Sequence, residues 1–321
     1  MVHADKITSL KQKKKRIFIV GPTGVGKSAL ALHLAKDLQG EILSLDSMQI
    51  YRGMDIGTAK ATIEEQHIVP HHLLDIAEPS ERYTVADYQR DAEKAEDKVF
   101  ARGKLPIFVG GTGLYLNALL MNYQFSGMDT TSSWRSVLEE EYRKDQGIAL
   151  YQELTLHDPE TAKRLTPNDK PRLLRAVEIL RRTGQAPSLL RRDRENETWK
   201  SLVLVLSLPR EQLYEAINAR VLRMVDAGLA REVHALIHQG VPPESQAMRA
   251  IGYREYVWYF RGLLTEEETI RLIQRASRQY AKRQYTWYRK TKEALWIEEE
   301  NPKKRIERAK QEILAFLNVK Q

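Results

Sequence analysis

A glycine-rich turn followed by a lysine and a serine is the first feature of the sequence that can do chemistry. It reads GPTGVGKS and fits the phosphate-loop pattern G-x-x-x-x-G-K-[ST]. Backbone N–H groups of such a turn surround phosphate oxygens, Lys27 adds a positive charge, and the Ser28 hydroxyl can hold Mg²⁺. The residues expected to bind phosphate or diphosphate are Gly21, Pro22, Thr23, Gly24, Val25, Gly26, Lys27 and Ser28. By itself this motif does not specify ATP.

A carboxylate, Asp46, follows the second apolar run of the chain. Residues 41–45 read EILSL, and Asp46 opens the stretch DSMQIYRGMDIGTAK. Ligands of open α/β sheets bind at the carboxyl ends of the strands, so we expect Asp46 to face the phosphate loop. A helix N-cap is the alternative interpretation of Asp46 and Ser47.

A second glycine turn, GGTGLYLNALL at residues 110–120, also follows an apolar run. Thr112 in this turn and Thr23 in the first can line one ligand from two sides, although a packing turn is the alternative. The run at 105–109 ends without an acidic residue, where many nucleotide-hydrolysing proteins hold Mg²⁺ through water. This absence counts against an ordinary ATPase.

The elements that must position these residues alternate between strand and helix. Strands are predicted at 16–20, 41–45, 105–109, 201–208 and 294–297, and helices at 28–38, 83–102, 211–227 and 229–238. From Asn122 to Lys200 helix follows helix. We therefore predict an α/β fold: a P-loop NTPase-like parallel sheet flanked by helices at 1–121 and 200–321, and an inserted all-helical domain at 122–199.

Composition limits the class of protein. The 321 residues suffice for two domains, and the absence of cysteine excludes disulfides, thiol nucleophiles and cysteine-bound zinc. Neither a membrane span nor a secretory signal is recognisable, so we expect a cytoplasmic protein that does not act on membranes. Three histidines, His67, His71 and His72, suggest metal, but no carboxylate joins them at ligand spacing, and we favour a structural role.

The net charge of +8 is concentrated in two segments. Residues 163–194 hold ten Lys or Arg against three Asp or Glu, and residues 271–292 hold eight against none. In the second segment Tyr280, Tyr285, Trp287 and Tyr288 lie among the cations, and Trp287 is the ring that we most expect in the core. Cations contact phosphates and aromatic rings stack on unpaired bases, so looped RNA is the expected ligand. The cations predicted to share one helical face are Arg271, Arg275, Arg278, Lys282 and Arg289.

Taken together and in order, several stretches resemble the tRNA dimethylallyltransferases, also called tRNA isopentenyltransferases. They read GPTGVGKSALA, LDSMQIYRGMDIGTAK, PHHLLDI, VGGTGLYLNALL, PNDKPRLLRAVEI, AIGYREY and RQYAKRQYTWYR. The resemblance implies transfer of a dimethylallyl group from dimethylallyl diphosphate to N6 of the adenosine 3′ of the anticodon, with release of diphosphate. It also implies Mg²⁺ as cofactor, the tRNA anticodon stem-loop as partner, and a protein that we expect to be a monomer.

Catalytic roles follow from the same resemblance. Asp46 corresponds to the general base, Thr23 to a threonine near the reacting groups, and Lys27 and Arg220 to cations on the diphosphate. Thr112 and Arg135 match tRNA-contacting positions. The motifs and the basic segments together give the full set of predicted tRNA contacts: Asp46, Ser47, Met48, Gln49, Thr112, Arg135, Asn168, Asp169, Arg172, Arg175, Arg249, Gly252, Tyr253, Arg254, Arg278, Lys282, Arg283 and Trp287.

Three other functions compete with this one. A small-molecule or nucleotide kinase of the phosphate-loop class would leave the basic face at 271–292 unexplained. An RNA-binding protein with a regulatory nucleotide site would leave Asp46 and the second glycine turn without a role. A prenyltransferase acting on free AMP would not need either basic segment.

Overall fold

The computed structural model describes residues 14–121, 133–190 and 198–318, and the chain divides into two compact units. The core unit comprises Met1–Leu120 and Asn196–Gln321, and the inserted unit comprises Met121–Glu195. The last cations of the first basic segment, residues 191–194, lie outside the described residues.

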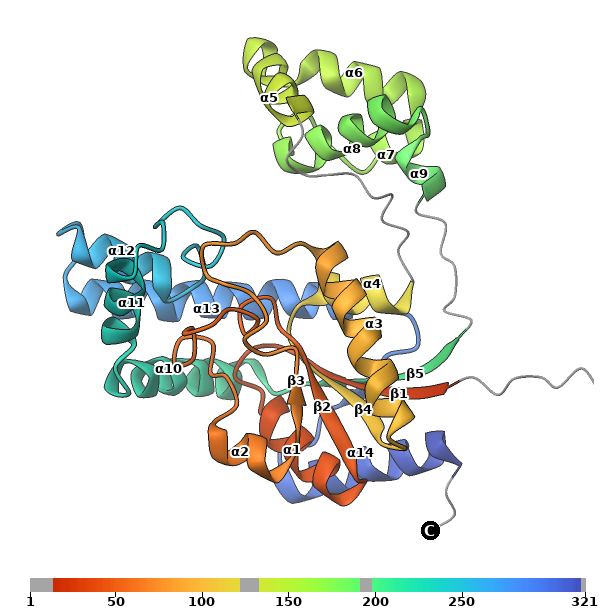
Figure 1. Ribbon diagram of the computed structural model, residues 1–321, viewed down its shortest axis with the longest axis vertical. Coiled ribbons are helices and arrows are strands. Elements are labelled where there is room, and N and C mark those ends of the chain that lie inside the picture. The colour runs from red at the N-terminus through yellow and green to blue at the C-terminus, as the bar shows by residue number, and fades with distance from the viewer. Residues whose placement is uncertain (1–13, 122–132, 191–197, 319–321) are drawn as a thin grey trace, which may run out of the picture. The chain divides into compact units, whose positions relative to one another are not determined.

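The core unit contains a parallel sheet of six strands, as predicted for a phosphate-loop protein (Figure 1). Its order is β3-β2-β4-β1-β5-β6, and every pairing is parallel. The strands are β1 Lys14–Val20, β2 Gly40–Leu45, β3 His71–His72, β4 Leu105–Gly110, β5 Trp199–Leu206 and β6 Leu295–Ile297. Because β1 and β4 are neighbours, the two glycine turns emerge side by side at one edge of the sheet.

Alternate residues of the central strands pack into two separate cores. Ile17 and Ile19 face the helices α1 (Lys27–Asp37) and α14 (Pro302–Leu317), whereas Phe18 and Val20 face α3 (Val85–Ala101) and α4 (Gly113–Leu120). A strand turns successive side chains to opposite faces, so a strand that is apolar at every position is buried on both. The unbroken apolar runs of the sequence thus become the middle layer of a three-layer unit.

The remaining helices of the core unit surround the carboxyl ends of the strands. They are α2 Ile63–Ile68, α10 Arg210–Asp226, α11 Leu229–His238, α12 Tyr253–Phe260 and α13 Glu266–Tyr288. The long helix α13 packs along α10 and also touches α12 and α4. It begins with a capping box in which the Thr265 hydroxyl accepts from the Glu268 amide.

A buried ion pair joins the sheet to its covering helix. The Arg16 guanidinium on β1 donates to both carboxylate oxygens of Glu96 on α3, and both side chains are almost fully buried. Arg16 also donates to the Ser201 hydroxyl and to the Leu119 carbonyl, so all three guanidinium nitrogens have acceptors. A charge can remain inside the protein when it is paired and hydrogen-bonded in this way.

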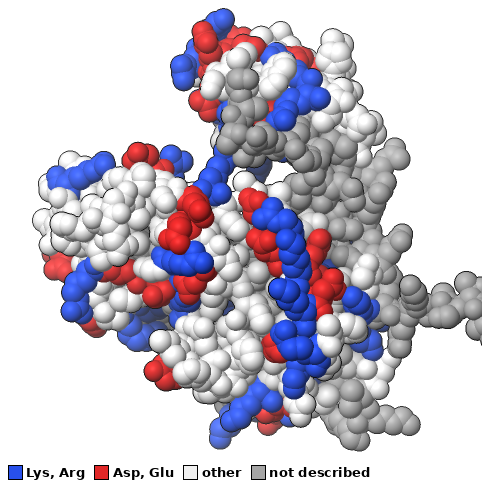
Figure 2. Space-filling view, in the orientation of Figure 1, with Lys and Arg blue, Asp and Glu red and all other residues white. Residues whose placement is uncertain are grey.

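The surface of α3 is mixed in charge. Figure 2 shows a line of basic side chains along this helix with acidic side chains on both sides of it. Arg90, for example, pairs with Asp87 and Asp91. Such alternation is typical of a solvated helix face and does not indicate a polyanion surface. At its start, Thr84 and Asp87 form a capping box.

The inserted unit consists of helices, as the sequence predicted. They are α5 Ser133–Asp145, α6 Ile148–His157, α7 Pro159–Ala162, α8 Lys170–Thr183 and α9 Pro187–Leu190. Leu138, Leu154, Leu173 and Val177 are fully buried in its own small core. Over the described ranges, neither unit contains a helix long and apolar enough to cross a membrane.

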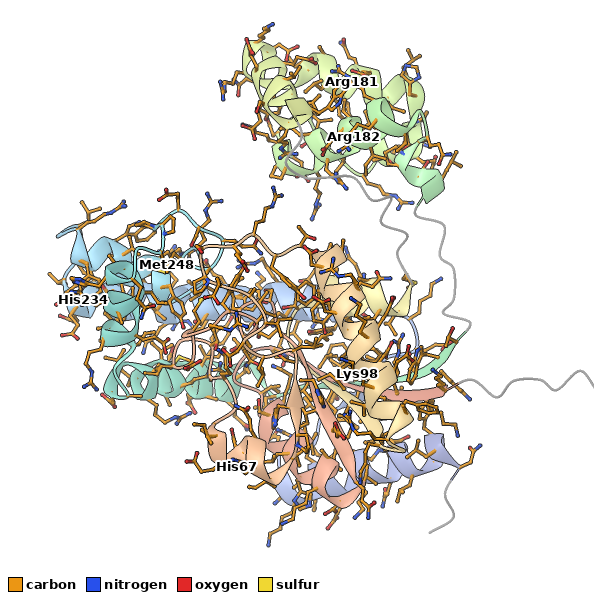
Figure 3. The ribbon with its side chains drawn as sticks, in the orientation of Figure 1. His67, Lys98, Arg181, Arg182, His234 and Met248 are labelled. Atoms are coloured by element: carbon orange, nitrogen blue, oxygen red, sulfur yellow. The ribbon has the colours of Figure 1, made fainter. Side chains whose placement is uncertain are left out.

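Two of the three histidines bond within the core unit: His71 Nδ1 lies 2.7 Å from the Val69 carbonyl, and His72 Nε2 lies 2.6 Å from Glu41, while His67 is exposed on α2 (Figure 3). No group of three or more potential metal ligands occurs among the described residues. The choice of Trp287 as the core ring was wrong. Tyr288 is the fully buried ring, because it points into the apolar layer, and Trp287 is only partly buried.

Candidate active site

The phosphate loop leads from β1 into α1 with a backbone that only glycine fits. Gly21 and Gly24 have φ of +145° and +83°, and an added Cβ would lie 2.6 Å from the Leu206 carbonyl and 2.9 Å from Ile217, respectively. No side chain caps the N-terminus of α1, and no acidic residue lies in its first turn. Its N–H groups and positive dipole end are therefore available to an anion.

Lys27 is partly buried behind the loop. Its Nζ donates to the Pro22 carbonyl at 2.8 Å. Burial, followed by the nearby Arg220 guanidinium, lowers the pKa of Lys27 to about 7, while the Asp46 carboxylate opposes this shift. An anion bound in the loop favours the charged amine, so diphosphate binding is linked to protonation of Lys27.

Arg220 reaches the same place from α10. It is partly buried, and its Nη2 donates to the Thr58 carbonyl at 3.4 Å. Burial lowers the pKa of Arg220, Asp46 raises it, and Arg223 lowers it further. A guanidinium stays protonated in spite of such a shift, so the site keeps one permanent cation beside the titratable Lys27.

Asp46 lies at the end of β2, on the side of the sheet that carries the phosphate loop. Its Oδ1 accepts from the Met48 amide at 2.9 Å, which makes an Asx turn. The alternative interpretation of Asp46 as a helix N-cap is wrong, because no helix begins there: residues 47–50 form turns. The Thr112 hydroxyl accepts from the Ser47 amide at 3.0 Å, so the second glycine turn holds the segment that carries Asp46.

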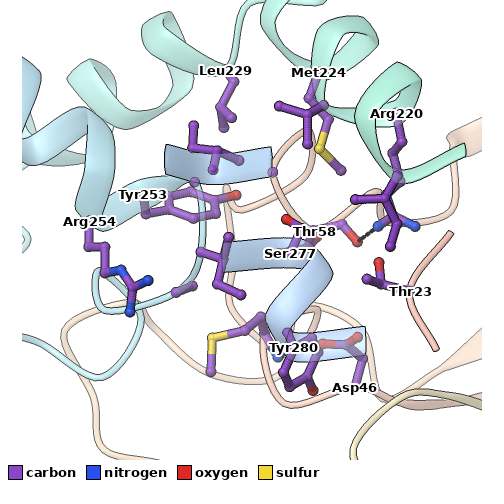
Figure 4. A pocket seen from close by; sticks show the side chains of 18 of the residues that line it. Thr23, Asp46, Thr58, Arg220, Met224, Leu229, Tyr253, Arg254, Ser277 and Tyr280 are labelled. Atoms are coloured by element: carbon purple, nitrogen blue, oxygen red, sulfur yellow. Dashed lines mark hydrogen bonds between the residues drawn. The ribbon is translucent and has the colours of Figure 1, made fainter. Parts of the chain in front are cut away.

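Tyr280 of α13 lies beside Asp46, as Figure 4 shows. Burial, followed by the Asp46 carboxylate, raises the pKa of Tyr280 to about 12. Its hydroxyl therefore remains protonated at neutral pH. The Asp46 carboxylate thus has a neutral O–H group beside it. Arg220 and Lys27 are close enough for the Asp46 charge to raise the pKa of each.

Two pockets meet at this carboxylate. The larger, of about 910 Å³, contains the phosphate loop from Thr23 to Ser28, and the smaller, of about 320 Å³, opens among the segment 249–254 and α13. The residues that line both are Thr23, Asp46, Thr58, Arg220, Met224 and Tyr280. A site of this form can place a leaving group on phosphate-binding groups in one pocket and a second reactant in the other.

Known proteins resemble this chain over most of its length. The family model for IPP transferase matches residues 49–291, and the model for isopentenyl transferase matches residues 15–76. This chain belongs to the IPP transferase family. A tRNA dimethylallyltransferase of Thermomicrobium roseum is 42% identical over 309 residues, 94% of each chain. One of Pelotomaculum thermopropionicum is 43% identical over 296 residues, 92% of this chain and 94% of the relative.

Solved structures of the family share the fold. The full-length tRNA isopentenylpyrophosphate transferase of Bacillus halodurans is 40% identical, covers 96% of this chain and 97% of its own, and has a TM-score of 0.72. A eukaryotic dimethylallyltransferase, described in snapshots of its action on tRNA, is 30% identical, covers 95% of this chain and 79% of its own, and has a TM-score of 0.81.

Within this IPP transferase, eight of the predicted tRNA contacts line the smaller pocket: Asp46, Ser47, Met48, Arg249, Gly252, Tyr253, Arg254 and Arg283. Arg249 and Arg283 are exposed, and Arg254 is partly exposed over the Trp258 ring. Tyr253 differs from these, because its ring is buried and its hydroxyl donates to Glu232. The smaller pocket therefore has an apolar interior and a rim of arginines.

Other predicted contacts lie elsewhere. Gln49 lines the larger pocket, and its amide bonds Ser44, Thr58 and Ala59. Thr112 holds Ser47, as described. The Trp287 ring packs against Gly113, where an added Cβ would lie 2.4 Å from it. Gln49, Thr112 and Trp287 contact the backbone of the site in this structure, and their contact with tRNA stays a prediction.

The basic stripe of α13 faces away from the pockets. At about 100° per residue, Arg271, Arg275, Arg278 and Lys282 fall within roughly 60° of one another, and Tyr280 falls roughly 180° away. Arg278 donates to Asn218 of α10, while the other three are exposed. Cations and the Tyr280 ring, which the sequence placed on one RNA surface, thus belong to two separate faces of the helix.

In the inserted unit, the predicted cations have acidic neighbours. Arg135 pairs with Glu139, Arg172 with Asp169, and Arg175 with Glu178. Arg181, seen beside Arg182 on α8 in Figure 3, joins Glu141 and Glu153 of two other helices. The surface is less unbalanced in charge than the sequence alone implied, and its tRNA contacts, with Asn168 and Asp169, remain predictions.

Two residues that sequence reasoning missed hold the loop between Asp46 and α2. The Glu232 carboxylate on α11 accepts from the amides of Asp55, Ile56 and Gly57. Lys60 is buried and donates to Asp55, Asp75 and the Tyr51 carbonyl. An acid on an ordinary amphipathic helix carries no sign of such a role, so only the fold reveals it.

Proposed function

We propose that this chain transfers a dimethylallyl group from dimethylallyl diphosphate to N6 of the adenosine 3′ of the anticodon in tRNA, with release of diphosphate. The observation that carries the proposal is the pair of pockets that meet at Asp46, one containing the phosphate loop and the other a rim of arginines. Membership of the IPP transferase family supports it over nearly the whole chain.

The larger pocket takes the diphosphate. The N–H groups of residues 24–28 and the start of α1 receive its oxygens, and Lys27 and Arg220 supply positive charge. Charge on the leaving diphosphate grows as the C–O bond breaks, so fixed cations lower the barrier more than they strengthen substrate binding. The dimethylallyl carbon then lies toward Asp46, where both pockets meet.

The smaller pocket takes the adenine. A base in the anticodon loop has to leave its stack, at a cost of a few kcal/mol, before it can enter such a pocket. Arg249, Arg254 and Arg283 at the rim contact the phosphates of the flanking nucleotides, and apolar side chains such as Ile273 and Leu229 line the interior. This division explains why the cations stand at the opening.

Asp46 accepts the proton. The N6 lone pair is delocalised into the ring, so attack on the dimethylallyl carbon is aided when a carboxylate removes the proton as the C–N bond forms. The C–O bond electrons leave with diphosphate, and the N6 proton passes to Asp46. The Asx turn to Met48 fixes one carboxylate oxygen and leaves Oδ2 for this transfer.

The donor set fits Mg²⁺ bound together with the diphosphate. Ser28 offers a hydroxyl at the start of α1, and no acidic cluster that could form an all-protein cage occurs in the described part of the chain. Mg²⁺ favours such sites, in which it keeps several waters and binds through substrate phosphates. When bound, it would neutralise charge that develops on the leaving group. The cytoplasmic location and monomeric state stay predictions.

Labelled substrates test the proposal. Labelled dimethylallyl diphosphate and, separately, labelled ATP are each incubated with tRNA or with AMP. We expect label from dimethylallyl diphosphate in tRNA alone. Phosphate transfer from ATP would favour a kinase, label in AMP would favour the free-nucleotide enzyme, and binding of RNA without transfer would favour the regulatory RNA-binding protein.

A further inference from the structure

A buried amide on α13 joins the two glycine turns of the core unit. The Gln284 side chain is 5% exposed. Its Oε1 accepts from the Thr23 amide in the phosphate loop at 2.9 Å, and its Nε2 donates to the Gly111 carbonyl in the second turn at 2.9 Å. One side chain thus bonds the backbone of both turns.

The two bonds require the amide group. Thr23 presents a donor and Gly111 an acceptor, so the bridging side chain must offer one acceptor and one donor at the same distance from its backbone. The planar amides of Asn and Gln carry both, and Asn is one methylene shorter. A carboxylate could keep the bond to Thr23 but would lie against the Gly111 carbonyl without a proton to share.

Gly111 leaves room for this amide. A Cβ at residue 111 would lie 2.2 Å from Gln284 Nε2, which is too close for any real side chain. The backbone of Gly111 does not itself demand glycine, because its φ is not in the left-handed region. Glycine at this position is therefore explained by the contact with Gln284.

The connected segments are the walls of the proposed active site. Thr23 lines both pockets, and Tyr280, one helical turn before Gln284, lines both beside Asp46. Thr112 follows Gly111 and holds the Ser47 amide next to Asp46. Gln284 is thus bonded to the loop on the diphosphate side and to the turn that supports the general base.

We infer that Gln284 is a positioning residue that fixes Thr23 and the 111–112 turn relative to one another, so that the diphosphate ester and the Asp46 carboxylate meet at reacting distance. This inference rests on the proposed transferase function. Gln284 lines the larger pocket, but its two bonds go to Thr23 and Gly111 and not to the amides of residues 24–28, which receive the diphosphate. Its loss should therefore lower kcat and leave the KM for dimethylallyl diphosphate nearly unchanged.

Steady-state kinetics of Gln284→Met test this, because methionine keeps the length of the side chain and removes both bonds. We expect kcat to fall by about 10- to 100-fold, the range for a misplaced reacting group. The KM for dimethylallyl diphosphate should stay within about twofold of the parent. Gln284→Glu, which retains the acceptor for Thr23, should lie between. Gln279→Ala, an exposed glutamine on the same helix, is the matched control and should behave as the parent.

Gly111→Ala supplies an independent test that leaves Gln284 in the sequence. The added methyl should displace the amide and lower kcat as Gln284→Met does. Combined with Gln284→Ala, which vacates that space, the same change should cost far less, so the two effects are strongly non-additive.

Additive effects, or parent kcat in Gln284→Met and Gly111→Ala, would overturn the inference while the parent enzyme still transfers the dimethylallyl group. Circular dichroism checks the folding of each variant. If Gln284→Met does not fold, the kinetics of Gly111→Ala decide the question. If the parent itself transfers nothing to tRNA, the proposed function fails, and this inference fails with it.

Discussion

The two units of the chain hold their charged side chains in different ways. Two groups of the core unit have partners distant in sequence: the buried Arg16 pairs with Glu96, and the half-buried Glu232 accepts from the amides of residues 55–57. Among the described residues of the inserted unit, most ion pairs lie three or four residues apart on one helix, such as Arg172 with Asp169.

The cost of losing a partner differs between buried and exposed charges. A buried charge that loses its partner is strongly destabilising, so the Arg16–Glu96 pair fixes α3 against β1. An exposed pair at helical spacing contributes little and exchanges partners easily. An exposed cation such as Arg172 can therefore exchange its carboxylate for another anion at small cost, whereas the buried Arg16 cannot.

The largest expected effect is at Asp46. Asp46→Ala should lower kcat by roughly 10²-fold or more, the range for a lost general base, while tRNA affinity stays near the parent. Asp46→Asn is the matched control, because its amide oxygen preserves the bond from the Met48 amide but cannot take a proton. Both variants should be equally impaired in single-turnover transfer. An active Asn variant would assign Asp46 to the turn alone.

Stability should distinguish the two kinds of ion pair. Glu96→Ala leaves the Arg16 guanidinium buried without its carboxylate and should cost about 3–5 kcal/mol of unfolding free energy. Arg172→Ala in the inserted unit should change it by less than about 1 kcal/mol. Urea unfolding monitored by circular dichroism measures both. Similar losses in the two variants would contradict the distinction.

The charge of Lys27 predicts a pH dependence for diphosphate binding. With a pKa near 7 in the free protein, Lys27 is charged below pH 7 and largely neutral above pH 8. The bound anion needs the charged form of Lys27. Above pH 7 the Kd of inorganic diphosphate should therefore increase with pH, by up to about tenfold per pH unit, and binding should be accompanied by proton uptake. Calorimetry in buffers of different ionisation enthalpy measures both quantities.

Lys27→Met is the control for this titration. It should bind diphosphate weakly at every pH and remove the proton uptake, because no amine is left to titrate. A parent protein whose affinity is flat between pH 6 and pH 9 would show that Lys27 is already charged throughout that range.

The smallest expected effect concerns the stripe on α13. Reversing Arg271 and Arg275 to Glu should weaken binding of tRNA and reduce the slope of log Kd against log salt concentration by about 1 for each lost phosphate contact. Diphosphate affinity should not change, because the stripe faces away from the pockets. Lys303→Glu with Lys304→Glu on α14 is the charge-matched control. If both double variants bind tRNA alike, the stripe is only a solvated face.

Local sequence patterns predicted most of the fold. The strands at 16–20, 41–45 and 105–109 and the helix at 229–238 match the structure within two residues, because burial on both faces leaves unbroken apolar runs. The edge strand at His71–His72 was not predicted, since two residues carry no periodicity. Trp287 and Tyr288 were exchanged because both rings suit a core and only the rotation of α13 decides which enters it.

The site residues that could be predicted are likewise those that belong to local sequence patterns. Glycine spacing and the place of Asp46 after a strand gave the phosphate loop and the carboxylate, because both are local. Gln284 and Glu232 were missed, because each acts on backbone groups far away in the sequence and neither belongs to a pattern. Likewise, only the fold shows that Tyr280 and the basic stripe lie on opposite sides of one helix.

The most direct test of the two-pocket account is a crossed binding measurement. Inorganic diphosphate and an anticodon stem-loop RNA are titrated by calorimetry into the parent, into Lys27→Met, and into Arg249→Ala combined with Arg283→Ala. We expect Lys27→Met to lose diphosphate binding and keep the RNA, and the double arginine variant to do the reverse. If one change weakened both ligands equally, or if both variants kept both ligands, the assignment of one pocket to each substrate would be contradicted.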